Sequence, residues 1–315
     1  MRIRDKVKKP QRPVVAYEIL PPREKDGTLN SYAETISSLL SQTHIDAVNI
    51  PEVHDEIGRG DRPVTNQKRG EPREFGMLLQ DIVGIEAIIN RVVVHEPYEE
   101  QMRWIEETNT TYEIENMIIV GGESSKVDYP GPTVNEMLQS IAKRSNSNGG
   151  DIFCGGIAIP SRKDESKNLI RKSEHGSEFF TTQVLYDAEN INKMINNYQS
   201  RCNELDTFPR RILLSFAPVS SQKNIEFLKW LGVEIPDDTE RYLKGRPGSM
   251  TERSLDVAVE VLNEILDHIT FNNLKVPVGL NVEHIMSYNF QSSVEMLQEL
   301  ARIYREFCIK SQQYS

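Results

Sequence analysis

The sequence predicts a single α/β domain folded as a (β/α)8 barrel, also called a TIM barrel. Three observations carry this prediction: 315 residues suit one such barrel, eight apolar β-rich runs alternate with helical patterns, and no composition break divides the chain. Strands that are apolar on both faces indicate a parallel sheet covered by helices. An open doubly wound sheet is the alternative, but the Gly-x-Gly-x-x-Gly turn typical after its first strand is absent here.

The eight predicted strands follow one another along the chain. They are residues 14–20, 45–51, 87–95, 116–122, 152–159, 179–187, 211–218 and 276–284. Helical patterns lie between them. The clearest of these patterns cover residues 29–41, 99–107, 134–144, 165–175, 190–202 and 254–269. Polar, glycine-containing segments at 58–74 and 145–150 are expected to be loops, and residues 13–315 are expected to form the barrel behind a basic, solvated tail at 1–12.

Composition narrows the classes of partner. A net charge of −10 disfavours nucleic acid and anionic membranes. No apolar run approaches the roughly 18 residues of a membrane span, and the basic start of the chain lacks the apolar centre of a signal peptide. Three widely spaced cysteines match neither a disulfide framework nor a zinc motif, which favours a cytoplasmic location. Homo-oligomer formation is left open, because barrels often oligomerise but no helix shows an exposed apolar stripe.

One carboxylate stands inside the first predicted strand. Glu18 lies in the apolar run VVAYEIL, and the Pro21-Pro22 pair that follows ends the strand. Burial raises the pKa of a carboxyl, which is what a general acid working near neutral pH requires. The alternative interpretation is a core glutamate paired with an arginine. Both interpretations place the side chain of Glu18 in apolar surroundings.

Polar residues recur where the predicted strands end. Barrel active sites are built from these C-terminal strand ends, so the candidates are Glu18, Asn49, Glu52, His95, Glu123, Ser161, Gln183, Asp187, Ser220, Asn281, Glu283 and His284. Carboxylates and amides without a Ser-His-Asp order or an HExxH helix favour proton transfer and hydrogen bonding to a polar heterocycle. We predict no metal site, although His95 and His284 with Glu123 are the nearest alternative.

Two segments resemble the methylenetetrahydrofolate reductase family. YEILPPR at 17–23 is similar to the family's first-strand signature of an aromatic residue, Glu, two apolar residues and Pro-Pro followed by Arg or Lys. ESKNLIRKSEHGSEFFTTQVLYD at 165–187 resembles the family's helix with Asn-Leu and a basic pair, then a glycine and a strand that ends in Thr-Gln. The resemblance runs from Val14 to about Leu300.

The resemblance implies a folate chemistry for the strand-end residues. Glu18 would protonate N10 of a reduced folate, while Glu123 and Gln183 hold the pterin and Asn49, at the place of a family threonine, assists. FAD would relay hydride from NADH or NADPH to the methylene group of the folate. The residues that would contact the ribose and phosphates of FAD are Glu165, Asn168, Arg171 and Lys172.

The chain also departs from the family pattern. Gly121 replaces the arginine of Arg-Gly-Asp, Ile159-Pro160-Ser161 replaces Tyr-Pro-Glu, and the family's stacking aromatic falls near Gln222. Its third-strand histidine aligns nearest Arg91, with His95 as the substitute. Two alternatives therefore stay open: a flavin-independent reductase or methyl-transfer partner of a corrinoid protein on the same barrel, and a non-catalytic folate-binding subunit.

Overall fold

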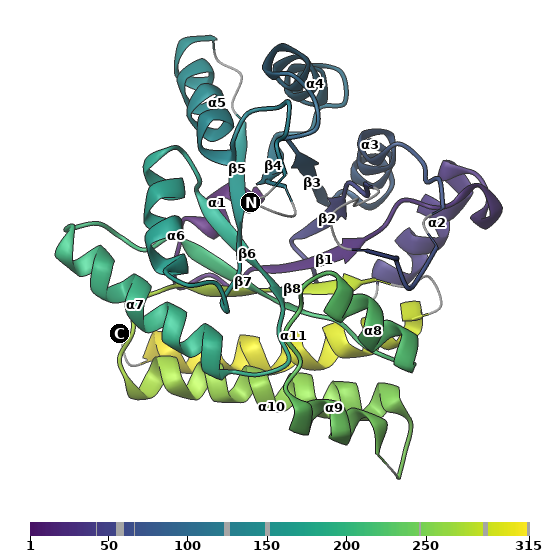
Figure 1. Ribbon diagram of the computed structural model, residues 1–315, viewed down its shortest axis with the longest axis vertical. Coiled ribbons are helices and arrows are strands. Elements are labelled where there is room, and N and C mark those ends of the chain that lie inside the picture. The colour runs from purple at the N-terminus through teal and green to yellow at the C-terminus, as the bar shows by residue number, and fades with distance from the viewer. Residues whose placement is uncertain are drawn as a thin grey trace.

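The computed structural model describes residues 1–41, 43–54, 60–65, 67–122, 127–148, 152–245, 247–285 and 289–313. Eight parallel strands close into a barrel in chain order (Figure 1). The strands are β1 Val15–Ile19, β2 Ala47–Pro51, β3 Glu86–Val92, β4 Asn116–Val120, β5 Phe153–Ala158, β6 Phe179–Val184, β7 Arg211–Phe216 and β8 Val278–His284. The predicted fold class and all eight predicted strands are confirmed. Several predicted strands run further because their apolar residues continue into the following loops.

Helices surround the barrel. They are α1 Ile3–Val7, α2 Leu29–Leu40, α3 Pro72–Val83, α4 Tyr98–Thr110, α5 Val134–Asn148, α6 Glu165–Glu174, α7 Glu189–Glu204, α8 Gln222–Trp230, α9 Asp237–Lys244, α10 Met250–Phe271 and α11 Phe290–Gln313, with a 3-10 turn at Glu24–Asp26. The six predicted helices are confirmed. Among the described residues, none of these helices combines the length and apolar character that crossing a membrane demands.

Two segments predicted as loops contain helix. Helix α3 begins inside the predicted loop 58–74, because the Glu71 side chain accepts the backbone N–H of Glu74 and Pro72 occupies the first turn, where its missing N–H costs nothing. Helix α5 likewise continues to Asn148, inside the predicted loop 145–150. The capping signal of α3 was present in the sequence but was outweighed by the glycine-rich polar stretch before it.

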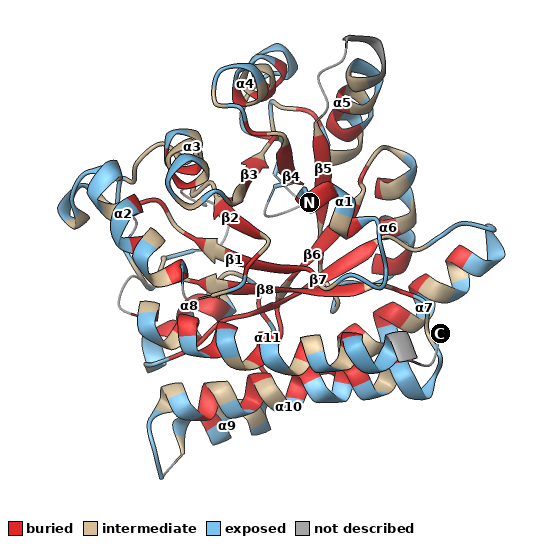
Figure 2. Cartoon of the chain, turned by 180° about the vertical axis from the view of Figure 1, so that it is seen from behind, coloured by how far each residue is buried: buried red, intermediate tan, exposed pale blue. Residues whose placement is uncertain are grey.

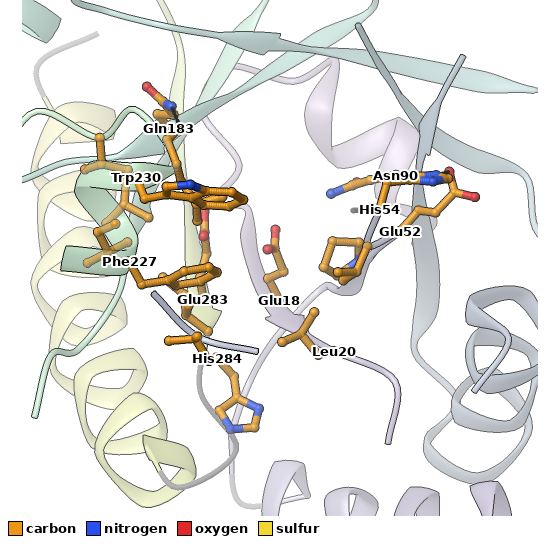
Figure 3. Close-up of a pocket in the computed structure, with 18 of the residues that line it drawn as sticks. Glu18, Leu20, Glu52, His54, Asn90, Gln183, Phe227, Trp230, Glu283 and His284 are labelled. Carbon is orange, nitrogen blue, oxygen red and sulfur yellow. Dashed lines mark hydrogen bonds and ion pairs between the residues drawn. The ribbon is translucent and has the colours of Figure 1, made fainter. Parts of the chain in front are cut away.

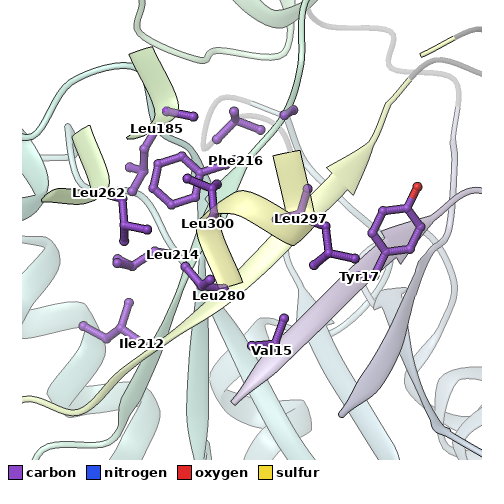
Figure 4. Packing of buried hydrophobic residues seen from close by; sticks show 14 of the residues in the cluster. Val15, Tyr17, Leu185, Ile212, Leu214, Phe216, Leu262, Leu280, Leu297 and Leu300 are labelled. Atoms are coloured by element: carbon purple, nitrogen blue, oxygen red, sulfur yellow. The ribbon is translucent and has the colours of Figure 1, made fainter. Parts of the chain in front are cut away.

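Side chains alternate between the inside and the outside of the barrel, as the two-residue period of strands requires. Outward-facing residues of β7 and β8, such as Leu214 and Leu280, pack with Leu262 of α10 and Leu297 of α11 (Figure 4). The outer faces of the helices are exposed and the faces toward the strands are buried (Figure 2). This packing leaves the inward-facing residues to fill the barrel or to line a site.

The N-terminal end of the barrel is closed by helix α1. Its Ile3 and Val7 are 2% and 3% exposed and pack with inward-facing residues such as Phe153. The backbone N–H of Ile3 donates to Glu86 at the start of β3, with an N to Oε1 distance of 2.8 Å. The prediction that residues 1–12 form a solvated tail is therefore wrong for Ile3–Val7, whereas residues 8–12 are exposed. Two apolar residues four apart among the basic ones place one face of this short helix in the barrel.

Candidate active site

A cavity of about 660 Å³ lies at the opposite end, where the C-terminal ends of the strands meet (Figure 3). Its volume falls in the range of small-molecule sites, and barrel active sites occupy this end. Glu18 of β1 stands in the middle of the close-up. Gln183, Glu283 and two aromatic rings lie on one side of it, and Glu52, His54 and Asn90 lie on the other.

Glu18 and Glu283 lie directly beside each other. The parallel register of β1 and β8 pairs Glu18 with Glu283, so both side chains project from the same face of the sheet into the cavity (Figure 3). Both are partly accessible from the cavity and otherwise enclosed by protein. Two carboxyl groups therefore share one poorly solvated space.

Neutral amides and one hydroxyl, that of Ser215 beside Glu283, are the hydrogen-bond donors to this pair. Asn49 Nδ2 donates to Glu18 Oε2 at 2.6 Å. Asn281 Nδ2 lies 3.4 Å from Glu18 Oε2 and 3.3 Å from Glu283 Oε1, and it donates to Ser215 Oγ at 3.0 Å. One NH2 group has only two protons for these three acceptors. Within the described residues, the donors to the two carboxyls are therefore neutral groups rather than cations.

The electrostatics of the pair follow from this environment. Burial raises the pKa of Glu18 to about 7, and the hydrogen bond from Asn281 acts in the opposite direction. Burial, followed by the charge of Glu18, raises the pKa of Glu283 well above its usual value. Within the described residues the contacts of Glu18 are with amides rather than with an arginine. The structure thus supports an acid near neutral pH over a core ion pair.

Glu52 illustrates the opposite outcome within the same cavity. Burial alone would raise its pKa, but a hydrogen bond with His54 and the charge of Arg91 outweigh burial and lower the pKa. Arg91 Nη1 lies 2.5 Å from Glu52 Oε1, and the backbone N–H of Val92 donates to Oε2 at 3.0 Å. Glu52 is therefore held as a carboxylate. Of these two carboxyls, Glu18 rather than Glu52 is therefore the candidate proton donor.

Gln183 of β6 also lines the cavity. Its Nε2 donates to the backbone oxygen of Leu231 at 3.1 Å, which orients the amide (Figure 3). The structure thus brings Glu18, Asn49 and Gln183 to one end of the barrel, as expected, and their chemical roles stay predictions. Glu123, the fourth residue predicted for catalysis or pterin binding, lies outside the described residues.

An aromatic wall, which the sequence reasoning missed, lies beside Gln183. Phe227 and Trp230 of α8 are stacked, with ring centroids 5.9 Å apart and planes 15° apart. The guanidinium of Arg62 lies 5.2 Å and 5.3 Å from these two centroids, within cation–π range. Aromatic residues three apart on a helix are typical of a buried core face, so the sequence carries no signal that these rings face a ligand site.

Comparisons with known proteins identify the family. A family model described as methylenetetrahydrofolate reductase matches residues 2–297. The chain belongs to the methylenetetrahydrofolate reductase family. Methylenetetrahydrofolate reductase 1 of Schizosaccharomyces pombe is 26% identical over 161 residues, which are 47% of this chain and 24% of that protein. The match thus spans about a quarter of that relative.

A solved structure supports the same fold. It is described as an uncharacterised protein from Clostridium thermocellum that binds two copies of 5-methyl-5,6,7,8-tetrahydrofolic acid. Its TM-score with this chain is 0.76 at 22% identity, and the superposition covers 96% of this chain and 99% of that one. This likeness establishes a shared barrel architecture for the reductase-family chain.

The four residues predicted to bind FAD lie on α6, where two of them are turned inward. Glu165 is 2% exposed and accepts hydrogen bonds from the backbone N–H of Ile159 at 3.1 Å and from Asn168 Nδ2 at 2.8 Å. Lys172 is also buried and lies 3.5 Å from Glu165 Oε1. Arg171 is exposed and donates to Asn168 Oδ1 at 3.0 Å. Glu165 and Lys172 therefore fasten α6 to the end of β5, and FAD binding by this group stays a prediction.

The remaining candidates at strand ends, Ser161, Asp187 and Ser220, lie in loops and at a helix start. Ser161 is exposed, and Asp187 accepts the backbone N–H of Glu189 at 3.0 Å at the start of α7. Ser220 donates to Asn289 Oδ1 at 2.6 Å, which joins the loop after β7 to the start of α11. Asp187 thus caps the start of a helix and Ser220 joins two segments of the chain.

His95 and His284, the two histidines considered as metal ligands, have different neighbours. His95 lies against His54, with ring centroids 4.8 Å apart, whereas His284 lines the cavity and contacts Phe290 edge-on at 5.2 Å. In the part of the chain that the structure describes, no three His, Cys, Asp or Glu side chains are grouped as metal ligands.

Proposed function

We propose that this chain binds a reduced folate in the 660 Å³ cavity and reduces its methylene bridge to a methyl group with hydride from NADH or NADPH. The observation that carries the proposal is Glu18, an enclosed carboxyl with a pKa raised to about 7 on the first strand of a reductase-family barrel. A carboxyl with an ordinary pKa would be almost fully ionised at neutral pH and could not serve as the acid.

In this reaction Glu18 gives its proton to N10 of the folate. The bond between N10 and the bridging carbon breaks, and its electron pair stays on N10. The bridging carbon remains on N5 as a cationic iminium. Hydride from the reduced nicotinamide then adds to that carbon, which yields the methyl group and the oxidised nicotinamide. One proton and one hydride are consumed, so atoms and electrons balance.

The cavity has surfaces that suit a pterin. Gln183 has an amide that can donate and accept, which matches a ring that presents both kinds of group. Asn49 lies beside the acid, 2.6 Å from Glu18 Oε2, and can hold the carboxyl in place as the proton leaves. The stacked rings of Phe227 and Trp230 offer an apolar face to a planar ligand. Glu123 remains proposed as a pterin contact.

The described residues do not fit a diphosphate site for FAD on α6. The ammonium of Lys172 lies against Glu165 and the backbone of Ile157, so its charge is already compensated. Arg171 alone projects from the group as an exposed cation. This arrangement favours direct hydride transfer from the nicotinamide. A colourless purified protein whose visible spectrum does not change on addition of FAD would support direct transfer, whereas a bound flavin spectrum would contradict it.

The test of the acid is Glu18→Gln. We expect reduction of methylenetetrahydrofolate to fall by about 10²–10⁴-fold, the usual contribution of general acid catalysis, while folate binding by calorimetry is kept. Glu260→Gln, an exposed glutamate on α10, is the matched control and should keep full activity. An unchanged rate in Glu18→Gln would overturn the assignment.

Two outcomes identify the alternatives. Folate binding without turnover by either nicotinamide would assign a non-catalytic folate-binding subunit. Methyl transfer to a corrinoid acceptor in the absence of nicotinamide would assign the methyl-transfer role. Turnover with NADH or NADPH excludes the non-catalytic subunit and makes the methyl-transfer role unnecessary.

A further inference from the structure

The neighbouring carboxyls of β1 and β8 form an unusual pair. Their Cα atoms are register partners in adjacent parallel strands, and their side chains enter the cavity together (Figure 3). Asn281, which is fully buried, lies within 3.4 Å of Glu18 and 3.3 Å of Glu283. The two groups thus lie in the same surroundings and have the Asn281 amide in common, while Asn49 donates to Glu18 and Ser215 to Glu283. Glu283 has no part in the reaction described above.

Other charged groups line the same cavity without contacting the pair in the described structure. The cations are Arg23, Arg62, Arg69 and Lys223. Arg23 is held by Asp26 at 2.7 Å, Arg69 donates to the backbone oxygen of Pro21 at 2.8 Å, and Arg62 lies over the aromatic wall. The titratable neighbours are Glu52, His54 and His284 at the cavity, with Tyr186 behind Glu283.

Two adjacent carboxyls in such an enclosed space resist losing both protons. Ionising the second group places a like charge beside the first, where little water screens it. The pair then titrates as a unit, and one proton stays on it over a wide pH range. The raised pKa values of both groups agree with this behaviour.

We propose that Glu283 is the second member of a carboxyl pair that holds one proton jointly with Glu18, and that it is the positioning residue that keeps Glu18 protonated for the reduction. The sharing of the proton stands on the geometry of β1 and β8. Its use in catalysis rests on the proposed function.

Charge balance gives the pair a second effect. Before the reaction the pair holds one proton and has a charge of −1. When Glu18 gives that proton to N10, the pair becomes −2 just as the folate becomes a cationic iminium. Fixed negative charge that grows opposite a developing cation stabilises the transition state. Hydride addition then neutralises the cation, and solvent returns a proton to the pair.

The direct test follows protonated carboxyl groups by infrared difference spectroscopy during a pH titration of the free protein. The wild type should show a protonated-carboxyl signal that titrates near neutral pH. In Glu283→Gln this titration should move at least about one pH unit lower, because the like charge is gone. Glu18→Gln should likewise lower the pH at which the signal of Glu283 titrates. Glu260→Gln should leave the titration unchanged. A Glu283→Gln titration at the wild-type pH overturns the proposal.

The catalytic arm measures kcat/KM for methylenefolate reduction against pH. Glu283→Gln should move the basic limb of the profile down by the same interval, and Glu283→Asp should restore part of it, which a merely structural loss would not do. If the infrared titration shifts as expected but the wild-type protein does not reduce methylenefolate, the carboxyl pair is supported and the proposed function is overturned. If the wild type turns over normally and Glu283→Gln leaves the basic limb unmoved, the proposed function is supported and the role of Glu283 is overturned. If Glu283→Gln fails to fold, the Glu18→Gln titration decides the matter.

Discussion

The two ends of the barrel treat buried charge in opposite ways. At the N-terminal end the guanidinium of Arg211 is 1% exposed and donates to the backbone oxygens of Val7 at 3.2 Å and Lys9 at 2.7 Å, and to Tyr304 at 3.2 Å. At the C-terminal end Glu18 and Glu283 have the amide of Asn281 in common, and their further donors, Asn49 to Glu18 and Ser215 to Glu283, are neutral as well. The guanidinium is surrounded by hydrogen-bond acceptors, whereas the two carboxyls have only neutral donors and raised pKa values.

The difference separates a stabilising site from a reactive one. A buried ion with all its hydrogen bonds made keeps its protonation state and holds neighbouring segments together. Carboxyls with too few donors retain a proton at a pH where free carboxylates have lost it. The end closed by α1 thus holds a buried charge in a structural role, whereas the open end is where we propose proton chemistry, and this contrast can be tested.

The largest expected effect is at the closed end. Arg211→Leu should lower the free energy of unfolding by about 4 kcal/mol, because several buried backbone oxygens lose their donor. Urea denaturation measures this loss. The matched control is Arg210→Leu, whose partly exposed ion pair with Glu178 should contribute under about 1 kcal/mol. Equal losses of stability in the two variants would contradict a special structural role for Arg211. Weaker folate binding by folded Arg211→Leu protein would contradict the separation of the two barrel ends.

The next effect concerns pH at the open end. The pKa of Glu18 is about 7 in the folded protein against 4.5 ordinarily, so the folded state binds more protons between these values and stability falls as pH rises through that window. The loss approaches about 3 kcal/mol. Glu18→Gln has no carboxyl at this position and so does not lose this stability. Its free energy of unfolding relative to that of the wild type should therefore increase from pH 4.5 to pH 7. Parallel curves from urea denaturation at each pH would refute this.

A smaller effect tests the role of α1. Ile3→Ala should cost about 2 kcal/mol, because it removes buried methyl groups from the end of the barrel. Lys9→Ala, at an exposed position just after the helix, is the control and should change stability by less than about 0.5 kcal/mol. Thermal and urea unfolding measure both. A neutral Ile3→Ala would mean that the first residues behave as a tail after all.

The smallest effect lies beside the carboxyl pair. The hydrogen bond from Ser215 lowers the pKa of Glu283, so Ser215→Ala should raise the titration of the pair by up to about one pH unit, equivalent to about 1 kcal/mol. Ser200→Ala, on the exposed face of α7, is the control and should leave the titration where it is. A downward shift in Ser215→Ala would show that the hydroxyl does not favour the ionised form.

The sequence predicts those features of the structure that depend on residues close together in the chain, and it misses those that depend on distant residues. The eight strands were predictable because residues buried on both faces form continuous apolar runs. Glu18 and Gln183 followed from their position at strand ends. Helix α1 was missed because only Ile3 and Val7 mark its buried face. Phe227 and Trp230 were missed because their spacing does not reveal which surface they face.

The pairing of Glu18 with Glu283 required a different kind of information. Glu283 was a candidate by its place at the end of the last strand, but only the closure of the barrel sets its register against the first strand. Non-local pairings of this kind depend on the whole fold rather than on any local pattern. The same limit applies to Glu165 and Lys172, whose inward orientation on α6 depends on β5.

The meeting of β1 with β8 also has a consequence during synthesis. Asn281 and Glu18 are 263 residues apart, so the donor and both carboxyls come together only when the last strand has left the ribosome and closed the ring. A nascent chain that ends before β8 holds a lone Glu18 and an unpaired sheet edge, which is open to association with other chains. The enclosed surroundings of Glu18 thus form only when the last strand closes the barrel.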